Sequence, residues 1–532
     1  MDYLNLCLIC KDENDYLPEW LDYHILMGVD RFYIYDNESQ VSLRESLKEY
    51  IERGWVVVID ISGKGMQLHA YEHCLQAFGL NTFWMGFIDT DEFLVPKTTL
   101  DLKSLLKDYE EYGGLVVSSL FFGANGHQVR PNAGQIAAYT QSTHATFQGN
   151  ILIKSIVQPA RVLMPASPHD FAYKEKSWCV NENYLLVDGM KFPHYEGKIQ
   201  LNHYFCRSQS EIDLKLSRGW ADHAVGSWPR ERFEVVNTQA SYKENTILQK
   251  LAEVMERMGV DVGDIVSNPE STGLLKKMAN AASQCLPVPM KPVQLLQAGR
   301  QPKITTAAEL KAQTLAADER GDHQEAIRLI KLRLEEMPQK ISLFVDLSVN
   351  YLHMGDPSLA WEELSRAWKL APNSYHVLMG MAFFFLNVKN YEMAEKTCTL
   401  LFEMAPHNLT IMGYLTEALM GQSRGEEALK VGLPVVELAD TLGELPKGMA
   451  AHLVKLMADY LLEKKEYARA ISLWEARLDE QKDDLHILLE LCRALLHKGD
   501  LDAACQRLSQ AQVLAPENEE VLALLRQVGA IS

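Results

Sequence analysis

The segment Trp84-Met85-Gly86-Phe87-Ile88-Asp89-Thr90-Asp91-Glu92 decides the fold of the N-terminal half of this chain. Its apolar side chains suit a protein interior, and three carboxylates then follow within four residues. Outward from this segment, apolar runs predict strands and helically spaced apolar residues predict helices, in alternation. The predicted strands cover residues 4–10, 31–35, 56–61 and 82–88, and the predicted helices cover residues 15–26, 43–53 and 67–78. This alternation is typical of an α/β domain built on a doubly wound sheet.

The carboxylates of Asp89 and Asp91 follow the fourth predicted strand directly. In an open α/β sheet, ligands bind beyond the carboxyl ends of the strands. Two carboxylates two residues apart at that edge suit a hard divalent cation, Mg²⁺ or Mn²⁺, that bridges to a diphosphate. The plainer alternative is a strand-to-helix turn capped by aspartates. No G-x-G-x-x-G follows the first strand and no G-x-x-x-x-G-K-[ST] occurs in the chain, which disfavours a dinucleotide dehydrogenase and a P-loop ATPase.

Several spaced motifs point together to one class of enzyme. They are LICKDENDYLPEWLDYHILMGVDRFYIYDNES (8–39), QLHAYEHC (67–74), WMGFIDTDEFLVP (84–96), KSIVQPARV (154–162) with His169, and LNHYFCRS (201–208). In this order they resemble glycosyltransferases of the GT-A fold, most closely the family 2-like and family 92 group. The similarity covers about residues 3–225. Two positions depart from that group, since Asp12 stands where an asparagine is usual and Gln40-Val41 replaces the usual aspartate.

The resemblance implies a nucleotide-sugar donor, most readily a UDP-sugar, and a Mn²⁺ or Mg²⁺ cofactor. The implied nucleotide-sugar contacts are Lys11, Asp12, Glu13, Asp36, Asn37, Gln67, Asp89, Lys154 and His169. The implied metal ligands are Asp89, Asp91 and His203, with Asp91 as the direct ligand. His203 is alternatively a packing residue beside Tyr204, and Lys154 and His169 are alternatively structural.

The reaction implied by the resemblance is an inverting single displacement onto a glycan, lipid-linked or protein acceptor. Such a reaction needs a carboxylate base to deprotonate the acceptor hydroxyl. Asp91 is expected to act through the metal, and the candidates for the base are Asp222, Glu175 and Asp170. We expect Asp91→Asn to abolish turnover without loss of heat stability, because it removes one of several clustered like charges.

The C-terminal half contains an internal repeat. Its marker is an alanine that recurs every 34 residues, with one step of 42, at Ala326, Ala360, Ala394, Ala428, Ala470 and Ala504. This period, together with Pro338, Pro372 and Pro406 in the same phase, resembles the tetratricopeptide repeat. About six units over residues 308–520 imply an all-α solenoid whose concave face binds a protein partner or the acceptor. A stabilising scaffold is the alternative.

These patterns divide the chain into three parts. They are a GT-A glycosyltransferase domain over residues 1–265, a linker over residues 266–307 and a tetratricopeptide-repeat domain over residues 308–532. Because each repeat contacts only its neighbours, truncation after about residue 300 is expected to leave a folded domain that keeps donor hydrolysis.

The composition restricts partners and location. Asp and Glu number 71 against 52 Lys and Arg, and the resulting net charge of −19 argues against a nucleic-acid-binding face. No apolar stretch of about 18 residues predicts a transmembrane helix, and the N-terminus lacks a signal-peptide pattern. The nine cysteines are scattered, and Cys7 and Cys10 are predicted to be buried thiols on a strand. A cytoplasmic location, or a peripheral one at the inner membrane, is therefore expected.

Two other function classes stay open. One is a catalytically inactive transferase-like scaffold that acts through its repeats; the intact Asp-Thr-Asp-Glu sequence speaks against it and Asp12 speaks for it. The other is a nucleotidyltransferase on the same kind of sheet. That enzyme would need a Gly-rich phosphate loop after the first strand, where this chain has Lys11-Asp12-Glu13.

Overall fold

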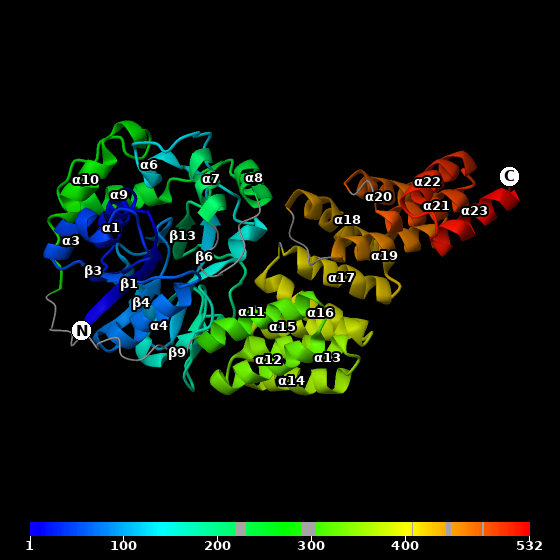
Figure 1. The fold of residues 1–532 in the computed structure, drawn as a ribbon, viewed down its shortest axis with the longest axis horizontal. Helices are drawn as coiled ribbons and strands as arrows, with labels where there is room; N and C mark the ends of the chain where they lie inside the picture. The colour runs from blue at the N-terminus through cyan, green and yellow to red at the C-terminus, as the bar shows by residue number, and fades with distance from the viewer. Residues whose placement is uncertain (219–229, 289–304, 407, 443–447, 481–483, 532) are drawn as a thin grey trace. The chain divides into compact units, whose positions relative to one another are not determined.

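The computed structural model describes residues 1–218, 230–288, 305–406, 408–442, 448–480 and 484–531. Within these residues the chain forms two compact units, Met1–Gly380 and Met381–Ser532. The first unit contains a sheet domain, residues 1–282, and the first helices of the repeat array (Figure 1). The division at Gly380 falls inside the repeats, so the first repeats fold as part of the same compact unit as the sheet domain.

The N-terminal part of the sheet domain alternates strands and helices. In order they are β1 (Asp2–Cys10), α1 (Leu17–Leu26), β2 (Arg31–Asp36), α2 (Leu43–Ser46), α3 (Lys48–Glu52), β3 (Val56–Asp60), α4 (Gln67–Phe78) and β4 (Thr82–Phe87). β1 pairs in parallel with β2 and β4, and β2 pairs in parallel with β3. The predicted α/β alternation is confirmed. The helix predicted over residues 43–53 is divided at Leu47, whose φ of −103° and ψ of 16° are not helical.

The rest of the sheet domain adds strands of both directions. Its elements are β5 (Glu92–Pro96), α5 (Leu102–Leu106), β6 (Gly114–Phe121), α6 (Gln135–Ala138), β7 (Gln141–Ser142), β8 (Ile153–Val157), β9 (Val162–Pro165), β10 (Phe171–Tyr173), β11 (Cys179–Val180), β12 (Leu186–Val187), β13 (Ile199–His203), α7 (Gln209–Arg218), α8 (Arg230–Gln239), β14 (Tyr242–Lys243), α9 (Thr246–Arg257) and α10 (Leu274–Ala282). The main sheet has the order β12-β11-β6-β8-β4-β1-β2-β3. β8 lies between β4 and β6 and runs antiparallel to both, so the sheet is mixed.

Strand β13 brings a distant part of the chain to the end of β4. It pairs in parallel with β6 and antiparallel with β5, so that His203 lies opposite both Phe121 and Glu92. Glu92 follows the two aspartates after β4 directly, and the pairing therefore places His203 beside them. This junction positions the site described below.

The two neighbouring cysteines of β1 lie on opposite faces of the sheet. Cys7 belongs to the apolar cluster formed with Tyr71 and Phe87, whereas Cys10 belongs to the larger cluster that contains Trp20. Both thiols are buried, and neither forms a disulfide. This confirms the prediction of core thiols, since residues three apart on a strand point to opposite faces.

Part of the segment predicted as a linker is a packed helix. Helix α10 buries Leu274, Met278, Ala281 and Ala282, and it packs against α1. These four residues recur at helical spacing, which the prolines that follow them obscured in the sequence. The predicted boundaries at residues 265 and 308 are otherwise untested, because residues 289–304 lie outside the described part of the chain.

The repeat half consists of helices throughout its described residues. They are α11 (Thr305–Glu319), α12 (His323–Glu336), α13 (Ile341–His353), α14 (Pro357–Leu370), α15 (Tyr375–Asn387), α16 (Tyr391–Met404), α17 (Leu409–Gly421), α18 (Gly425–Leu442), α19 (Met449–Glu463), α20 (Tyr467–Glu480), α21 (Leu485–Lys498), α22 (Leu501–Leu514) and α23 (Glu519–Ile531). The six repeating alanines are at most 1% exposed, which confirms them as close-packing positions. The predicted all-α repeat architecture is confirmed.

The turn inside each repeat has the same backbone conformation. One residue with positive φ precedes the second helix of each unit, and these residues are Gly321, Gly355, Lys389, Ser423, Lys465 and Gly499. The next residue caps the second helix in several units, as where the Asp356 side chain accepts a hydrogen bond from the Leu359 amide. Lys389, Ser423 and Lys465 therefore adopt a conformation that glycine takes at no steric cost.

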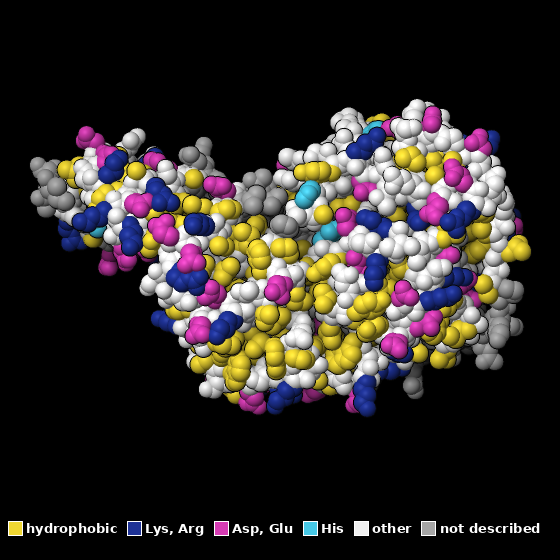
Figure 2. Space-filling view, turned by 180° about the vertical axis from the view of Figure 1, so that it is seen from behind, with side chains coloured by type: hydrophobic (Ala, Val, Ile, Leu, Met, Phe, Trp, Pro, Cys, Tyr) yellow, Lys and Arg dark blue, Asp and Glu magenta, His cyan; other side chains and the backbone are white. Residues whose placement is uncertain are grey.

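The surface carries charges of both signs. On the face drawn in Figure 2, acidic and basic side chains are interspersed and do not gather into one positive field. None of the helices in the described residues combines the length and the apolar character that crossing a membrane requires.

Candidate functional site

The carboxyl ends of β1 and β2 are joined by polar side chains. The Asp12 carboxylate accepts a hydrogen bond from the Gln40 amide at 2.7 Å, and the Asp12 amide donates to the Ser39 hydroxyl at 3.0 Å. Asp36 accepts from the Ser39 amide at 3.0 Å. Asp12 has a φ of 57°, a left-handed conformation that aspartate adopts more readily than most residues. Asp12 and Gln40, the two positions at which this chain differs from the family 92 group, are therefore hydrogen-bonded to each other.

Asn37 and Gln67 extend this polar edge on either side. The Asn37 amide group donates to the Gly63 carbonyl at 3.1 Å, in the loop after β3. Gln67, at the first turn of α4, donates to Asp89 at 3.2 Å. Lys11 lies at the end of β1 and is partly buried. The structure therefore brings Lys11, Asp12, Asp36, Asn37, Gln67 and Asp89 to one edge of the sheet, as their positions at strand ends predicted.

The lysine of β8 lies beneath the two aspartates. Lys154 is 2% exposed, and its Nζ lies 2.7 Å from Asp89 Oδ2 and 3.3 Å from Glu92 Oε2. Glu92 also accepts from the Asp89 amide at 2.9 Å. Burial raises the pKa of Glu92 to about 8, although Lys154 opposes this, so Glu92 is largely protonated at neutral pH. Lys154 therefore holds Asp89 and Glu92 from within the protein.

Asp91 is buried and is held from the opposite side. Lys215, on α7, places its Nζ 2.6 Å from Asp91 Oδ2. Burial favours protonation of Asp91, but the charges around it, led by that of Lys215, outweigh burial and hold its pKa well below the usual range. Asp91 is thus ionised at every physiological pH, as a metal ligand must be.

His203 lies between Asp91 and Glu92. Its Nε2 lies 3.8 Å from Asp91 Oδ1, and its Nδ1 lies 3.7 Å from Glu92 Oε1. Nδ1 is buried and makes no hydrogen bond. Burial lowers the pKa of His203 to about 3, so the imidazole is neutral. Histidines that bind metals commonly direct one ring nitrogen at the metal and the other N–H at a carboxylate.

The side chains of Asp91 and His203 suit a divalent cation that takes its other ligands from a substrate. Within the described residues, no group of three or more His, Cys, Asp or Glu side chains could hold a metal ion. Asp91 and His203 offer one oxygen and one neutral nitrogen on facing sides of the same space. Mg²⁺ is commonly bound through one or two carboxylates together with substrate phosphates and water, so two protein ligands are sufficient.

Arg207 completes the charge arrangement. It is 3% exposed, its Nη1 lies 2.8 Å from Glu13 Oε2, and its Nε donates to Gln135 at 2.9 Å. The site therefore contains three ion pairs: Asp89 with Lys154, Asp91 with Lys215, and Glu13 with Arg207.

Glu175 and Asp170 are placed apart from this cluster, whereas His169 lies against β8 beside Lys154. Glu175 is exposed on the turn before β11, and β11 pairs with the first residues of β6, the end remote from His203. Asp170 is buried and ion-paired with Lys340, which makes it a poor base. His169 is partly buried, and its Nδ1 lies 2.8 Å from the Ile153 carbonyl oxygen. Asp222 lies outside the described residues.

Three members of the cluster were not predicted from the sequence. Glu92 was visible as the third acid of the Asp-Thr-Asp-Glu sequence, and its position at the start of an apolar strand was the signal for burial. Arg207 belongs to a motif that was noted but given no role. Nothing in the sequence indicated that Lys215 would be buried beside Asp91, because a lysine on an amphipathic helix is ordinarily solvent-exposed.

The comparisons with known proteins agree with both halves of this description. Residues 7–197 match the model of Glycosyltransferase family 92, and residues 461–528 match a tetratricopeptide-repeat model, which confirms the two resemblances. A glycosyltransferase family 92 protein of Ricinus communis is 28% identical over 43% of this chain and 39% of its own length. The chain therefore spans about two fifths of the length of such relatives.

Two further proteins are similar to parts of the chain. A galactan β-1,4-galactosyltransferase of Arabidopsis thaliana is 29% identical over 19% of this chain and 22% of its own length. Among solved structures, Pseudomonas aeruginosa PilF matches with 20% identity and a TM-score of 0.34, covering 42% of this chain and 98% of PilF.

Proposed function

We propose that the N-terminal domain, a Glycosyltransferase family 92 domain by its family match, transfers a sugar from a nucleoside-diphosphate sugar to an acceptor hydroxyl. The observation that carries the proposal is the approach of Asp91 Oδ1 to His203 Nε2 at the carboxyl edge of the sheet. Ligands of open α/β sheets bind at this edge. The neighbouring strand ends supply further polar groups for a nucleotide.

The proposed enzyme depends on a divalent cation, Mn²⁺ or Mg²⁺, held by Asp91 and His203. When bound, the cation supplies positive charge against the nucleoside diphosphate that leaves. Glu92 would accept the Nδ1–H of His203 and fix the orientation of its ring. Asp89, whose side chain is 34% exposed and held by Lys154, stands beside them as the second metal or donor contact.

The donor proposed is a UDP-sugar. Asp12, Asp36 and Asn37, at the ends of β1 and β2, offer hydrogen-bond groups for the base and ribose. Lys215 and Arg207 lie at the other end of the site, where a diphosphate next to Asp91 would reach them. Because one similar protein is named as a galactosyltransferase, UDP-galactose is the first donor to test.

The proposed reaction is inverting, with direct transfer to a glycan, lipid-linked or protein acceptor. It needs a carboxylate that takes the proton from the acceptor hydroxyl. Asp222 is the proposed base, because Glu175 and Asp170 lie where they cannot serve the site. The repeats are proposed to bind a protein partner or the acceptor, and the protein is proposed to act in the cytoplasm or at the inner membrane surface.

The proposal is tested by measuring nucleoside diphosphate release from a panel of UDP-, GDP- and CMP-sugars, with Mn²⁺ and with a chelator. We expect release from one class of donor, in the presence of the metal only. Thermal stabilisation by donor plus Mn²⁺, measured in parallel, reports binding without turnover. Binding without release under any condition would instead favour the inactive scaffold, and release of pyrophosphate from a nucleoside triphosphate would favour a nucleotidyltransferase.

A further inference from the structure

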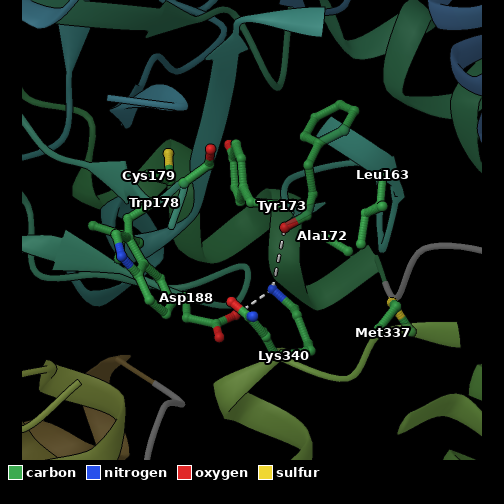
Figure 3. A pocket seen from close by; sticks show the side chains of 12 residues that line it. Leu163, Ala172, Tyr173, Trp178, Cys179, Asp188, Met337 and Lys340 are labelled. Carbon is green, nitrogen blue, oxygen red and sulfur yellow. Dashed lines mark hydrogen bonds and ion pairs between the residues drawn. The ribbon is translucent and has the colours of Figure 1, made fainter. Parts of the chain in front are cut away.

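The junction of the first two repeats is anchored in the sheet domain by a buried lysine. Lys340, between α12 and α13, has a side chain that is 6% exposed. Its Nζ lies 2.6 Å from Asp170 Oδ2 and also forms an ion pair with Asp188. Figure 3 shows the contact with Asp188 in a pocket lined by Trp178, Leu163 and Met337. All these residues belong to the compact unit Met1–Gly380.

The anchor contains more than one interaction. A buried ammonium is costly unless it is paired and hydrogen-bonded, and here two carboxylates satisfy it. The second oxygen of Asp188 accepts hydrogen bonds from the amides of Ile341 at 2.6 Å and Ser342 at 3.3 Å, at the N-terminus of α13. A carboxylate is favoured there because it satisfies free amides and faces the positive end of the helix dipole.

The other carboxylate of the anchor connects to the donor site. Asp170 closes a turn with Ser167 and follows His169 directly. The His169 carbonyl accepts a hydrogen bond from the Ser155 hydroxyl at 2.6 Å, and the His169 ring lies 2.8 Å from the Ile153 carbonyl oxygen. His169 therefore contacts strand β8 at Ile153 and at Ser155, the two residues on either side of residue 154.

That residue is Lys154, the partner of Asp89 and Glu92. Since successive residues of a strand point to opposite faces, fixing Ile153 and Ser155 fixes the direction of Lys154. The contacts thus run without a break from the junction of the first two repeats, through Asp170 and β8, to the Asp-Thr-Asp-Glu sequence.

We infer that Lys340 is a positioning residue for the donor site, and that the junction of the first two repeats is part of the catalytic module. This inference rests on the proposed function. It opposes the expectation from the sequence that truncation near residue 300 leaves donor hydrolysis intact, because such a truncation removes Lys340. The competing explanation is that Lys340 only joins two parts of the structure, so that its contacts affect stability and leave the donor site unchanged.

The full chain offers a matched pair of substitutions that separates the two explanations. Asp170→Asn and Asp188→Asn each remove one of the two carboxylates that contact Lys340 and leave the other in place. Asp170 directly follows His169, which contacts β8 at Ile153 and Ser155. The Asp188 carboxylate instead contacts the first turn of α13, and its chain reaches β8 only two residues later, where the Met190 carbonyl accepts from the Ile153 amide. We expect Asp170→Asn to raise the donor KM about tenfold, the lower end of the effect of outer partners of a site. Asp188→Asn should lower the thermal midpoint and leave the donor KM within about twofold.

A second measurement does not depend on activity. Hydrogen exchange of peptides covering residues 150–157 should become faster in Asp170→Asn and not in Asp188→Asn, in the absence of donor. Unchanged exchange and unchanged donor KM in Asp170→Asn would overturn the inference, as would equal effects of the two variants. If the wild type hydrolyses no donor but the exchange difference is present, the proposed function fails while the connection stands.

A milder variant covers the case in which Asp170→Asn does not fold. Ser155→Ala removes only the hydrogen bond to the His169 carbonyl, between the anchor and Lys154. It should produce a smaller change in the same two measurements. A folded Ser155→Ala protein with wild-type exchange over β8 and wild-type donor KM would overturn the inference.

Discussion

Lys215 Nζ lies 2.6 Å from Asp91 Oδ2, so the carboxylate proposed to bind the metal is already paired with a cation in the protein without metal. The same ammonium lies 2.9 Å from the Phe205 carbonyl oxygen. The pair occupies Oδ2 and leaves Oδ1 facing His203. Asp91 is therefore stabilised both as an anion and in a defined orientation.

Asp91→Asn should lose turnover and also lose stability. Removing one preorganised charge-stabilising group costs a factor of about 100 or more in rate. The sequence alone suggested unchanged or higher heat stability, but Lys215 then becomes a largely buried cation without its carboxylate, which costs about 2 kcal/mol. Steady-state hydrolysis and the thermal midpoint in EDTA measure the two effects. The double variant Asp91→Asn/Lys215→Met should recover part of the stability and none of the activity.

A matched control for this substitution is Asp108→Asn. Asp108 is exposed and lies on the sheet domain away from the strand ends. It should change neither turnover nor midpoint, since surface changes are usually within about 0.5 kcal/mol. An Asp91→Asn protein as stable as this control would contradict the importance of the ion pair with Lys215.

Lys215→Met should tighten the binding of Mn²⁺ alone. The ammonium competes with the cation for Asp91, and its removal should lower the dissociation constant for Mn²⁺ about tenfold, a difference of about 1.4 kcal/mol. Donor turnover should nevertheless fall, because Lys215 is proposed to contact the diphosphate. Calorimetric titration of Mn²⁺ without nucleotide checks the first point. Weaker binding of Mn²⁺ in this variant would show that Lys215 supports the metal site and does not compete with it.

His24 should contribute a loss of stability to the sheet domain below about pH 6.5, opposite in sign to the contribution of a buried acid with a raised pKa such as Glu92. Burial lowers the pKa of this histidine to about 3, and its ring lies 2.8 Å from the Trp20 carbonyl oxygen. The pKa of His24 is lower in the folded protein than in the unfolded chain. At a pH between these two pKa values, the unfolded chain therefore binds more protons than the folded protein. The free energy of unfolding therefore decreases as pH falls through this window, by at most about 1.4 kcal/mol per pH unit for one histidine.

The variant His24→Gln tests this pH dependence. Glutamine can still donate to Trp20 and accept from Leu94, but it does not titrate. Urea unfolding at several pH values between 7.5 and 5 should give a shallower slope for the variant than for the wild type. Parallel slopes would show that His24 does not contribute to the acid sensitivity.

Lys465→Gly should stabilise the second compact unit. Lys465 is exposed and has a φ of 63°, whereas the equivalent position of the next repeat is Gly499, with a φ of 84°. The left-handed conformation costs a residue with a Cβ about 1 kcal/mol, and glycine avoids this cost. Part of the gain is lost because glycine has more conformational freedom in the unfolded chain. Gly499→Ala is the reciprocal control, because a Cβ there meets no atom within 4 Å and only the conformation opposes it. Equal thermal midpoints for Lys465→Gly, Gly499→Ala and wild type would refute this account of the turns.

The sequence predicted the elements that local patterns define. Strand ends such as Cys10 and Phe87 were predicted closely, because buried apolar runs end where charged residues begin. The repeats were predicted from their period, and the buried alanines bear this out. The metal site stays a prediction: Asp91 was proposed from its position after the fourth strand, and His203 from the resemblance, and the structure places the two side by side.

The parts that were not predicted depend on contacts between distant residues. Lys215 meets Asp91 across 124 positions of sequence, and Lys340 meets Asp170 across 170. Neither lysine differs in its local sequence from a solvent-exposed one, so only the folded chain reveals its partner. The helix division at Leu47 and the helix of α10 were missed because prolines and polar residues masked short apolar patterns.

The most direct test of the central claim is pulsed electron paramagnetic resonance of Mn²⁺ bound to the protein in the presence of UDP. The account predicts one bound Mn²⁺ per chain, with nitrogen modulation from the His203 imidazole. This modulation should vanish in His203→Gln, and tight binding should vanish in Asp91→Asn. Bound Mn²⁺ with the same spectrum in both variants, or no bound Mn²⁺ in the wild type with UDP, would contradict a metal site formed by Asp91 and His203.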